Sequence, residues 1–153
     1  MKPTDFSKSL TDFLSKYLPG ERGMSPNTIN SYKITFILFI GFVESQKKIR
    51  VNKLSLKDIT KECINEFLEW LQRERKCSDS TRNVRLAAIH SFFSYLQYEA
   101  PENINEWQRI LSIKVKKTKK LSYKLQLELD SLPALLETLE QQVNRYQEQI
   151  NQP

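Results

Sequence analysis

Two segments of the chain share a pattern of small polar side chains, Ser-x-x-Thr-x-Asn, which occupies positions 25–30 and again 78–83. A serine just before a helix can cap it, and the first turn of that helix leaves backbone N–H groups facing outward. Together with the positive end of the helix dipole, these N–H groups favour an anion such as a phosphate. Because the chain is also basic, the repeated pattern predicts two capped helix starts that approach nucleic acid.

The first pattern continues into a polar stripe at helical spacing, Asn27, Ser31 and Thr35, with Thr28 and Lys33 on its flanks. Short polar side chains such as these bond phosphates or water, whereas asparagine can also read a base edge, with a preference for adenine. The alternative is an ordinary solvated face, since helix starts favour these residue types. Both interpretations stay open from the sequence alone.

The second pattern continues into Asn83, Ala87, His90 and Ser94, small or polar residues that would let a backbone approach DNA closely. The opposite face of the same helix is expected to enter the core and comprises Val84, Ala88, Phe92 and Tyr95. The alternative is again a solvated face with an incidental histidine. A single histidine without carboxylate or cysteine companions rarely builds a metal or catalytic site, so we expect no metal, cofactor or enzyme active site.

Positive charge is concentrated in the first part of the chain. The formal net charge is +6, of which residues 1–120 carry +9 and residues 121–153 carry −3. Cations near the second pattern and in a lysine run are Arg73, Arg75, Lys76, Arg82, Arg85, Lys114, Lys116, Lys117, Lys119 and Lys120. Charge runs are usually solvated surface, but lysines that contact phosphates would bind any sequence and depend strongly on salt.

The remaining composition excludes several classes of protein. A hydrophobic fraction of 39% in 153 residues supports one compact domain with an appendage. Cys63 and Cys77 have no spacing that suits a disulfide framework or a metal site. The N-terminus fits no signal peptide, and no apolar run reaches the roughly 18 residues that span a bilayer. We therefore expect a cytoplasmic protein, associated with the nucleoid when it binds DNA.

Apolar periodicity predicts an all-α fold. Residues at helical spacing indicate helices at about 6–18, 26–45, 60–76, 78–100 and 104–111. The expected caps are Ser25, Thr60 and Ser78, and Leu18-Pro19-Gly20 should end the first helix. A second apolar stripe on the second helix, Ile34, Leu38 and Phe42, indicates either burial on two sides or a protein-interaction surface.

From residue 121 the pattern changes to a heptad repeat. Apolar residues alternate at spacings of four and three, at Leu125, Leu129, Leu132, Leu136, Leu139, Val143, Tyr146 and Ile150. Such a stripe is typical of a coiled coil and needs a partner, either a second copy or another face of the protein. Pro133 would either begin the main helix or kink a longer one.

With these residues in view, positions 1 to about 120 resemble the N-terminal, core-binding SAM-like domain of tyrosine recombinases, the phage-integrase and Xer-like family. The resemblance rests on Ser-Pro-Asn-Thr-Ile-Asn-Ser-Tyr at 25–32, Leu-x-Asp-Ile-Thr at 56–60 and, most specifically, Ser-Thr-Arg-Asn-Val-Arg-Leu-Ala-Ala-Ile-His-Ser-Phe-Phe-Ser-Tyr-Leu at 80–96. It implies a SAM-like bundle of four or five helices whose second and fourth helices face the major groove. In the family, a C-terminal catalytic domain clamps the other face of the DNA.

The resemblance also implies roles for particular residues. It places Thr28, Ser31 and Lys33 near the DNA backbone, beside Asn27 of the polar stripe. It places in or beside the groove Thr81, Arg82, Asn83, Ala87 and His90, the last at a position where many relatives have arginine. The stretch 114–120 resembles the interdomain linker that crosses the duplex, with contacts expected from Lys116, Lys117, Lys119 and Lys120.

The catalytic residues of the family have no counterparts here. Its reaction needs two arginines, a lysine, a His-x-x-Arg pattern and a nucleophilic tyrosine in the C-terminal domain, whereas His90 is followed by Ser-Phe-Phe. We therefore expect this chain not to cut or join DNA.

The tail resembles a different protein family. Its sequence from 119, Lys-Lys-Leu-Ser-Tyr-Lys-Leu-Gln-Leu-Glu-Leu with Leu-Pro at 132–133, is similar to the start of the C-terminal coiled-coil arm of bacterial ABC-F ATPases. That arm is an antiparallel helical hairpin implicated in nucleic-acid binding, and only its first helix matches. The expected organisation is therefore a DNA-binding domain at 1–113, a basic linker at 114–120 and a coiled-coil tail at 121–153.

The leading hypothesis is a non-catalytic module that binds double-stranded DNA through its second and fourth helices and its linker. It should bind weakly alone, because half of the recombinase clamp is missing, and self-association through the tail could restore affinity by avidity. The rival hypothesis is a protein-interaction module, in which the apolar stripe of the second helix and the heptad tail assemble subunits.

Overall fold

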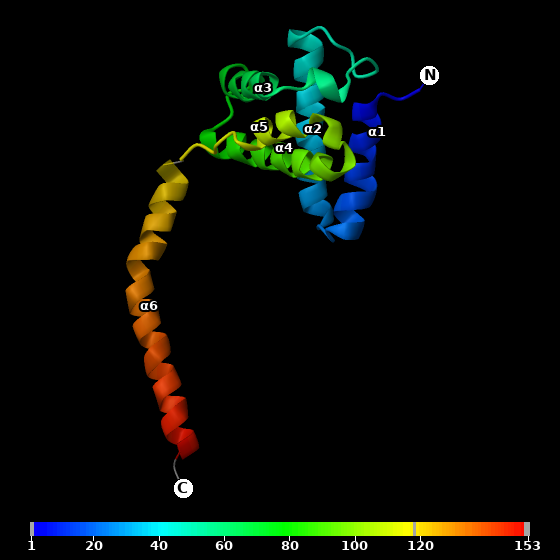
Figure 1. Cartoon of the computed structure of the whole chain (residues 1–153). Coiled ribbons are helices and arrows are strands. Elements are labelled where there is room, and N and C mark those ends of the chain that lie inside the picture. The colour runs from blue at the N-terminus through cyan, green and yellow to red at the C-terminus, as the bar shows by residue number, and fades with distance from the viewer. Residues whose placement is uncertain (1, 118, 152–153) are drawn as a thin grey trace. The chain divides into compact units, whose positions relative to one another are not determined.

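All regular structure in residues 2–117 and 119–151, which this computed structural model describes, is helical (Figure 1). The all-α prediction is therefore confirmed. The chain divides into two units, Met1–Lys116 and Lys117–Pro153. The helices of the first unit are α1 (Asp5–Asp12), η1 (Phe13–Glu21), α2 (Pro26–Gln46), η2 (Leu56–Asp58), α3 (Lys61–Arg73), α4 (Asp79–Glu99), η3 (Pro101–Asn103) and α5 (Ile104–Leu111). The boundaries predicted at 113 and 120 stay predictions.

Three of the longer helices begin at the predicted caps. The Oγ of Ser25 accepts a hydrogen bond from the N–H of Thr28 at 3.3 Å, and Thr60 caps α3 through the N–H of Cys63 at 3.1 Å. Ser78 caps α4 in the same way. Each bond gives a partner to a first-turn N–H that the helix cannot satisfy itself. The caps are therefore confirmed, and they place both Ser-x-x-Thr-x-Asn patterns at helix starts.

The first helix continues past the proline that was expected to end it. α1 passes into η1, a π-helical segment that contains Pro19. Proline has no N–H to donate, but the wider π turn continues at Arg22, whose N–H bonds the carbonyl of Tyr17 at 3.0 Å. Leu18 is fully buried and holds this turn against the core. The predicted end at Leu18 is therefore too early.

Aromatic rings join the helices at the centre of the first unit. The ring of Phe92, on α4, lies 6.1 Å from that of Phe6, 5.2 Å from that of Phe13 and 5.2 Å from that of Phe36. All four rings are almost completely buried. Because these residues come from α1, η1, α2 and α4, one cluster fixes the positions of the four elements relative to each other.

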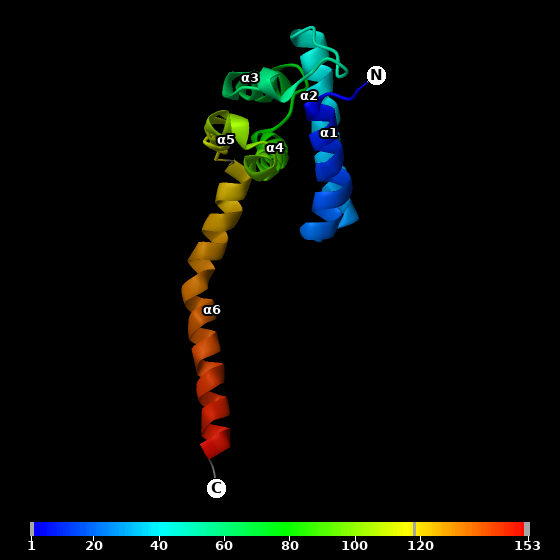
Figure 2. The same ribbon diagram turned by 45° about the vertical axis from the view of Figure 1, so that its right-hand side comes forward.

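α5 packs on the other side of α4. Trp107 is completely buried, its ring centre lies 5.1 Å from that of Phe93, and its indole N–H donates to the carbonyl of Ala100 at 2.8 Å. Arg109 extends the contact to α3 through an ion pair with Glu62. Figure 2 shows α4 with α5 on one side and α1 and α2 on the other.

This central position corrects two expectations from helical periodicity. Val84, expected in the core, is 49% exposed. Thr35, expected on a polar outer stripe, is completely buried. α4 contacts α1, α2, α3 and α5, so its buried surface is wider than one amphipathic stripe and its solvent-facing strip is displaced toward Val84. On α2, Phe42 is buried whereas Ile34 is 41% exposed, so two-sided burial holds for only part of the second apolar stripe.

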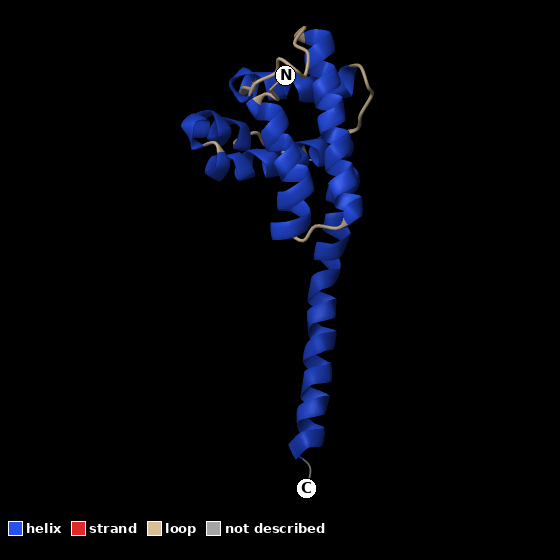
Figure 3. Ribbon diagram, turned by 90° about the vertical axis from the view of Figure 1, so that its right-hand side faces the viewer, coloured by secondary structure: helices blue, strands red, loops and turns tan. Residues whose placement is uncertain are grey.

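The second unit contains α6 (Lys119–Asn151), drawn with the other helices in Figure 3. It continues through Pro133, which agrees with the alternative of one longer helix. The seam side chains that the structure describes are more than half exposed: Leu136, Leu139, Val143, Tyr146 and Ile150. The side chains of Leu125, Leu129 and Leu132 lie outside the described residues. No helix in the described part of the chain is long and apolar enough to cross a membrane.

Replacing Phe92 with alanine should lower the free energy of unfolding by about 3–5 kcal/mol, because it leaves a cavity where four elements meet. Urea denaturation followed by tryptophan fluorescence measures the change. Tyr98→Ala on the same helix is the matched control: its ring is 85% exposed, and its loss should cost less than about 0.5 kcal/mol. Equal effects of the two substitutions would contradict the central role of Phe92.

Candidate nucleic-acid interface

The serine and threonine of each repeated pattern bond to each other. Besides the caps, the hydroxyl of Ser25 donates to that of Thr28 at 3.1 Å, and the hydroxyl of Ser78 donates to that of Thr81 at 3.2 Å. The three-residue spacing between serine and threonine in each pattern is therefore the spacing of a helix cap. Any contact with phosphate must come from the threonine O–H protons, which these bonds do not use, or from the other groups around the two helix starts.

Those other groups differ between the two helices. In α2, Pro26 lacks an N–H and Thr28 uses its own in the cap, which leaves the N–H of Asn27 for an outside partner. In α4, the first turn carries the carboxylate of Asp79, which accepts a hydrogen bond from Gln72 at 2.7 Å. A carboxylate at this position repels a phosphate. The electrostatics therefore favour the start of α2 as the anion-binding end.

The structure brings three of the predicted residues of α2 to the surface. Asn27, Thr28 and Lys33 are exposed. Asn27 and Lys33, with Asn30 between them, line an open hollow of about 580 Å³ that η1 closes on one side. Ser31 is only half-exposed. This end of α2 therefore combines a cation, two amide side chains and an open surface.

An arginine near the second pattern connects helices. Nη1 of Arg85 donates to the carbonyl of Ser31 and to the hydroxyl of Thr35, both at 3.2 Å. The Thr35 hydroxyl in turn donates to the Ser31 carbonyl at 3.2 Å. These bonds explain why Thr35 is buried, and they tie α4 to α2. The sequence placed Arg85 only within a cation cluster, because no local pattern indicates a partner 50 or more residues away.

The stripe on α4 is partly covered by later residues of the chain. Asn83 forms two hydrogen bonds with the backbone of Lys116, and Nε2 of His90 lies 3.2 Å from the carbonyl oxygen of Ile110. Ala87 and Ser94 are exposed. Among the residues of this helix that were predicted to lie in or beside the groove, Ala87 is thus exposed. Asn83 and His90 instead bond the backbone of residues after α4, at Lys116 and Ile110.

Arg82 is a second cation that the fold encloses. It is only 8% exposed, and burial lowers the pKa of its guanidinium while the charge of Asp79 opposes that change. Its Nη1 lies 3.4 Å from Oδ1 of Asn83. Thr81, half-buried, uses its hydroxyl within the cap. The DNA-contact roles of these residues stay predictions.

The linker lysines are not equivalent. Nζ of Lys116 donates to Oε1 of Gln72 at 2.8 Å and lies 3.9 Å from a carboxylate oxygen of Asp79. Lys114 and Lys117 are exposed. The side chains of Lys119 and Lys120 lie outside the described residues.

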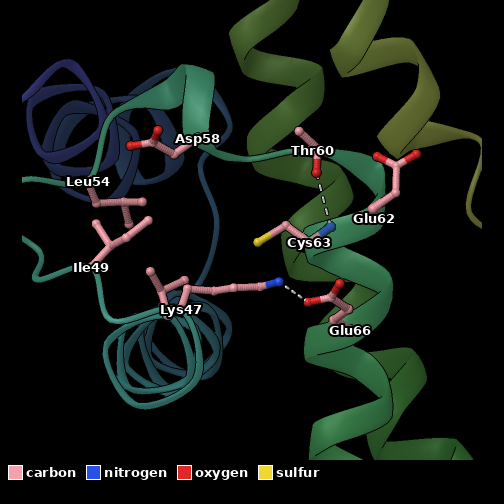
Figure 4. Close-up of a pocket in the computed structure, with 9 residues that line it drawn as sticks. Lys47, Ile49, Leu54, Asp58, Thr60, Glu62, Cys63 and Glu66 are labelled. Atoms are coloured by element: carbon pink, nitrogen blue, oxygen red, sulfur yellow. Dashed lines mark hydrogen bonds and ion pairs between the residues drawn. The ribbon is translucent and has the colours of Figure 1, made fainter.

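A small cavity lies where the connection from α2 meets α3. It measures about 160 Å³, and Figure 4 shows Lys47 reaching across it to an ion pair with Glu66. Burial raises the pKa of the Cys63 thiol to about 11, which keeps it protonated and unreactive at neutral pH. Among the described residues, no group of His, Cys, Asp and Glu could hold a metal ion.

The first unit is thus an all-α bundle in which α2 and α4 both begin at serine caps and a lysine-rich stretch follows α5. Residues 10–100 match the phage integrase, N-terminal SAM-like domain. The chain belongs to this family.

Its relatives are recombinases that extend well beyond the shared region. A putative integrase/recombinase, y4rC, of Sinorhizobium fredii is 35% identical over 116 residues, which are 76% of this chain and 35% of the relative. Tyrosine recombinase XerC of Herpetosiphon aurantiacus is 33% identical over 108 residues, 71% of this chain and 33% of that protein. The chain therefore spans about a third of these relatives' length. No solved structure matches the chain.

Replacing His90 with glutamine should remove a pH-dependent part of the stability. Burial lowers the pKa of His90 below 6.5 and outweighs the hydrogen bond to Ile110, which acts in the opposite direction. The unfolded chain therefore takes up this proton first, and the wild-type free energy of unfolding falls as the pH drops below 6.5.

Other titrating groups are common to both proteins, so the informative quantity is the stability of the wild type minus that of His90→Gln. Urea denaturation at a pH about one unit above and about one unit below the ordinary histidine pKa should show this difference shrinking at the lower pH. A constant difference would show that His90 titrates as a free side chain.

Proposed function

We propose that the first unit is the DNA-binding, core-binding module of a site-specific tyrosine recombinase. The observation that carries the proposal is the match of residues 10–100 to the N-terminal SAM-like domain of phage integrases. The charge of +9 on residues 1–120 supports it, because affinity for DNA rests mainly on cations that contact phosphates.

In this proposal the start of α2 and the outer strip of α4 face the duplex. Lys33 supplies a cation to the phosphates, and Asn27 and Thr28 supply hydrogen-bonding groups beside it. On α4, the exposed Ala87 and Ser94 allow the helix to lie close to the DNA. Phosphate contacts position a protein on the duplex, whereas base contacts give sequence preference. We therefore propose that Lys33 and Thr28 orient the domain on the duplex through phosphate contacts, and that Asn27 provides the sequence preference through a base contact.

We assign no cleavage step to these residues. Family membership concerns the N-terminal domain, and the curated relatives are about three times as long as the region they share with this chain. In this proposal the unit holds DNA in a defined orientation. Recombination itself is assigned to the longer proteins that contain such a unit, as the names of the relatives indicate.

The test is an electrophoretic shift of duplex DNA across a salt series. Each phosphate contact makes log K fall with log salt by about 0.9, so four contacts would weaken binding about a hundredfold between roughly 50 and 200 mM salt. Lys33→Glu should weaken binding and flatten this dependence by about one contact. Lys57→Glu, a charge reversal at an exposed lysine on η2, is the matched control. Absence of binding at low salt, or affinity that ignores salt, would contradict the proposal.

A second function is supported by the exposed seam of α6. In the heptad register, Leu136, Val143 and Ile150 occupy a positions and Leu139 and Tyr146 occupy d positions. Val143 and Ile150 at a positions and Leu139 at a d position fit the pattern of β-branched a residues with leucine at d that favours two parallel strands, whereas Leu136 and Tyr146 depart from it. We therefore propose that two copies of the chain associate through this seam, which would place two DNA-binding units on one particle and raise affinity by avidity.

Breaking the seam should halve the particle mass. Light scattering should give twice the mass of one chain for the wild type and the mass of one chain for the double variant Leu139→Glu/Val143→Glu, because two buried carboxylates cannot be accommodated in the seam. The control Thr138→Glu/Gln141→Glu adds the same charge to the outer face of the helix, and its particle mass should remain twice that of one chain. A wild type with the mass of a single chain would rule out this association.

A further inference from the structure

The contact between Asn83 and Lys116 involves every polar atom of the asparagine amide. Nδ2 of Asn83 donates to the carbonyl of Lys116 at 2.7 Å, and the N–H of Lys116 donates to Oδ1 of Asn83 at 2.9 Å. One side chain near the start of α4 therefore pairs with both backbone groups of a residue 33 positions later. Such a two-point contact fixes orientation as well as distance.

Lys116 is held by its side chain as well. Its Nζ donates to Oε1 of Gln72 at 2.8 Å, and the amide of Gln72 donates to Asp79 at 2.7 Å. The residue before the linker, Ile113, is 7% exposed and belongs to the core. The segment is thus anchored at Ile113 and again at Lys116, and Figure 1 shows it running back along α4 toward that helix's start.

This arrangement competes with base reading. An asparagine that reads adenine uses Oδ1 and Nδ2 together, which are the two atoms that bond Lys116. Asn83 cannot do both at once. Base reading would require the linker to detach and would leave two backbone groups without their partners.

We propose that Asn83 is a positioning residue that docks the basic linker against the start of α4. The docked linker holds Lys114, which is exposed, at a defined place beside the helix, and the exposed Lys117 follows Lys116 directly in the chain. The docking itself does not depend on DNA. The further step, that Lys114 and Lys117 contact phosphates, rests on the proposed DNA-binding function.

Hydrogen exchange in the full chain tests the docking. Asn83→Leu has a similar volume and no hydrogen-bonding groups, so the N–H of Lys116 should exchange at least about tenfold faster in this variant. Ser94→Ala, an exposed change three turns along the same helix, should leave that rate unchanged. In the unaltered chain, nuclear Overhauser effects between the Asn83 amide protons and the backbone at Lys116 provide a measurement that needs no variant. Unchanged exchange in Asn83→Leu, or absence of these effects, would overturn the docking.

Binding of duplexes of several unrelated sequences separates positioning from base reading. If Asn83 docks the linker, Asn83→Leu weakens binding to every duplex by the same factor. If the loss is confined to duplexes with a particular base, Asn83 reads that base and the inference is wrong. If the wild type binds no duplex at low salt, the proposed function fails while the exchange data still decide the docking.

Discussion

The burial of α4 among four neighbouring elements is the constraint on which the first unit depends. Phe92 joins it to α1, η1 and α2, and Phe93 joins it to Trp107 of α5. A helix surrounded in this way has one narrow strip left for solvent, and packing decides which residues form it. That strip contains Val84 and Ala87. Ala87 and Ser94 on this strip are small, so the helix backbone beside them is accessible to a large partner.

The same packing gives the two repeated patterns different surroundings although their caps are alike. Both serines satisfy first-turn N–H groups, so both patterns are explained by helix formation before any ligand is considered. The start of α2 then opens onto a hollow with Lys33, whereas the start of α4 carries Asp79 and the returning linker. Similar local sequence thus gives one end suited to an anion and one end occupied by the chain itself.

Local features could be predicted from the sequence, and contacts between distant segments could not. Caps and the short helix α5 depend on neighbouring residues, so Ser25 and Ser78 were placed correctly. Thr35 and Val84 were assigned to the wrong faces, because a helix packed on several sides has no single apolar stripe. The pairs Arg85–Thr35 and Asn83–Lys116 join residues 50 and 33 positions apart, and periodicity contains no information on either.

These long-range contacts determine how the lysine run at 114–120 can act on a polyanion. Five lysines in a flexible linker would attract any polyanion without orienting it. Once Lys116 is paired with Gln72 and Asp79, its charge is partly compensated, while Lys114, between the anchored residues Ile113 and Lys116, keeps its charge at a position that the bundle determines. Fixing cations in space costs conformational entropy when the protein folds instead of when it binds. In the proposed function, a docked linker therefore converts a diffuse attraction into a contact with a defined direction, as the orientation of DNA would require.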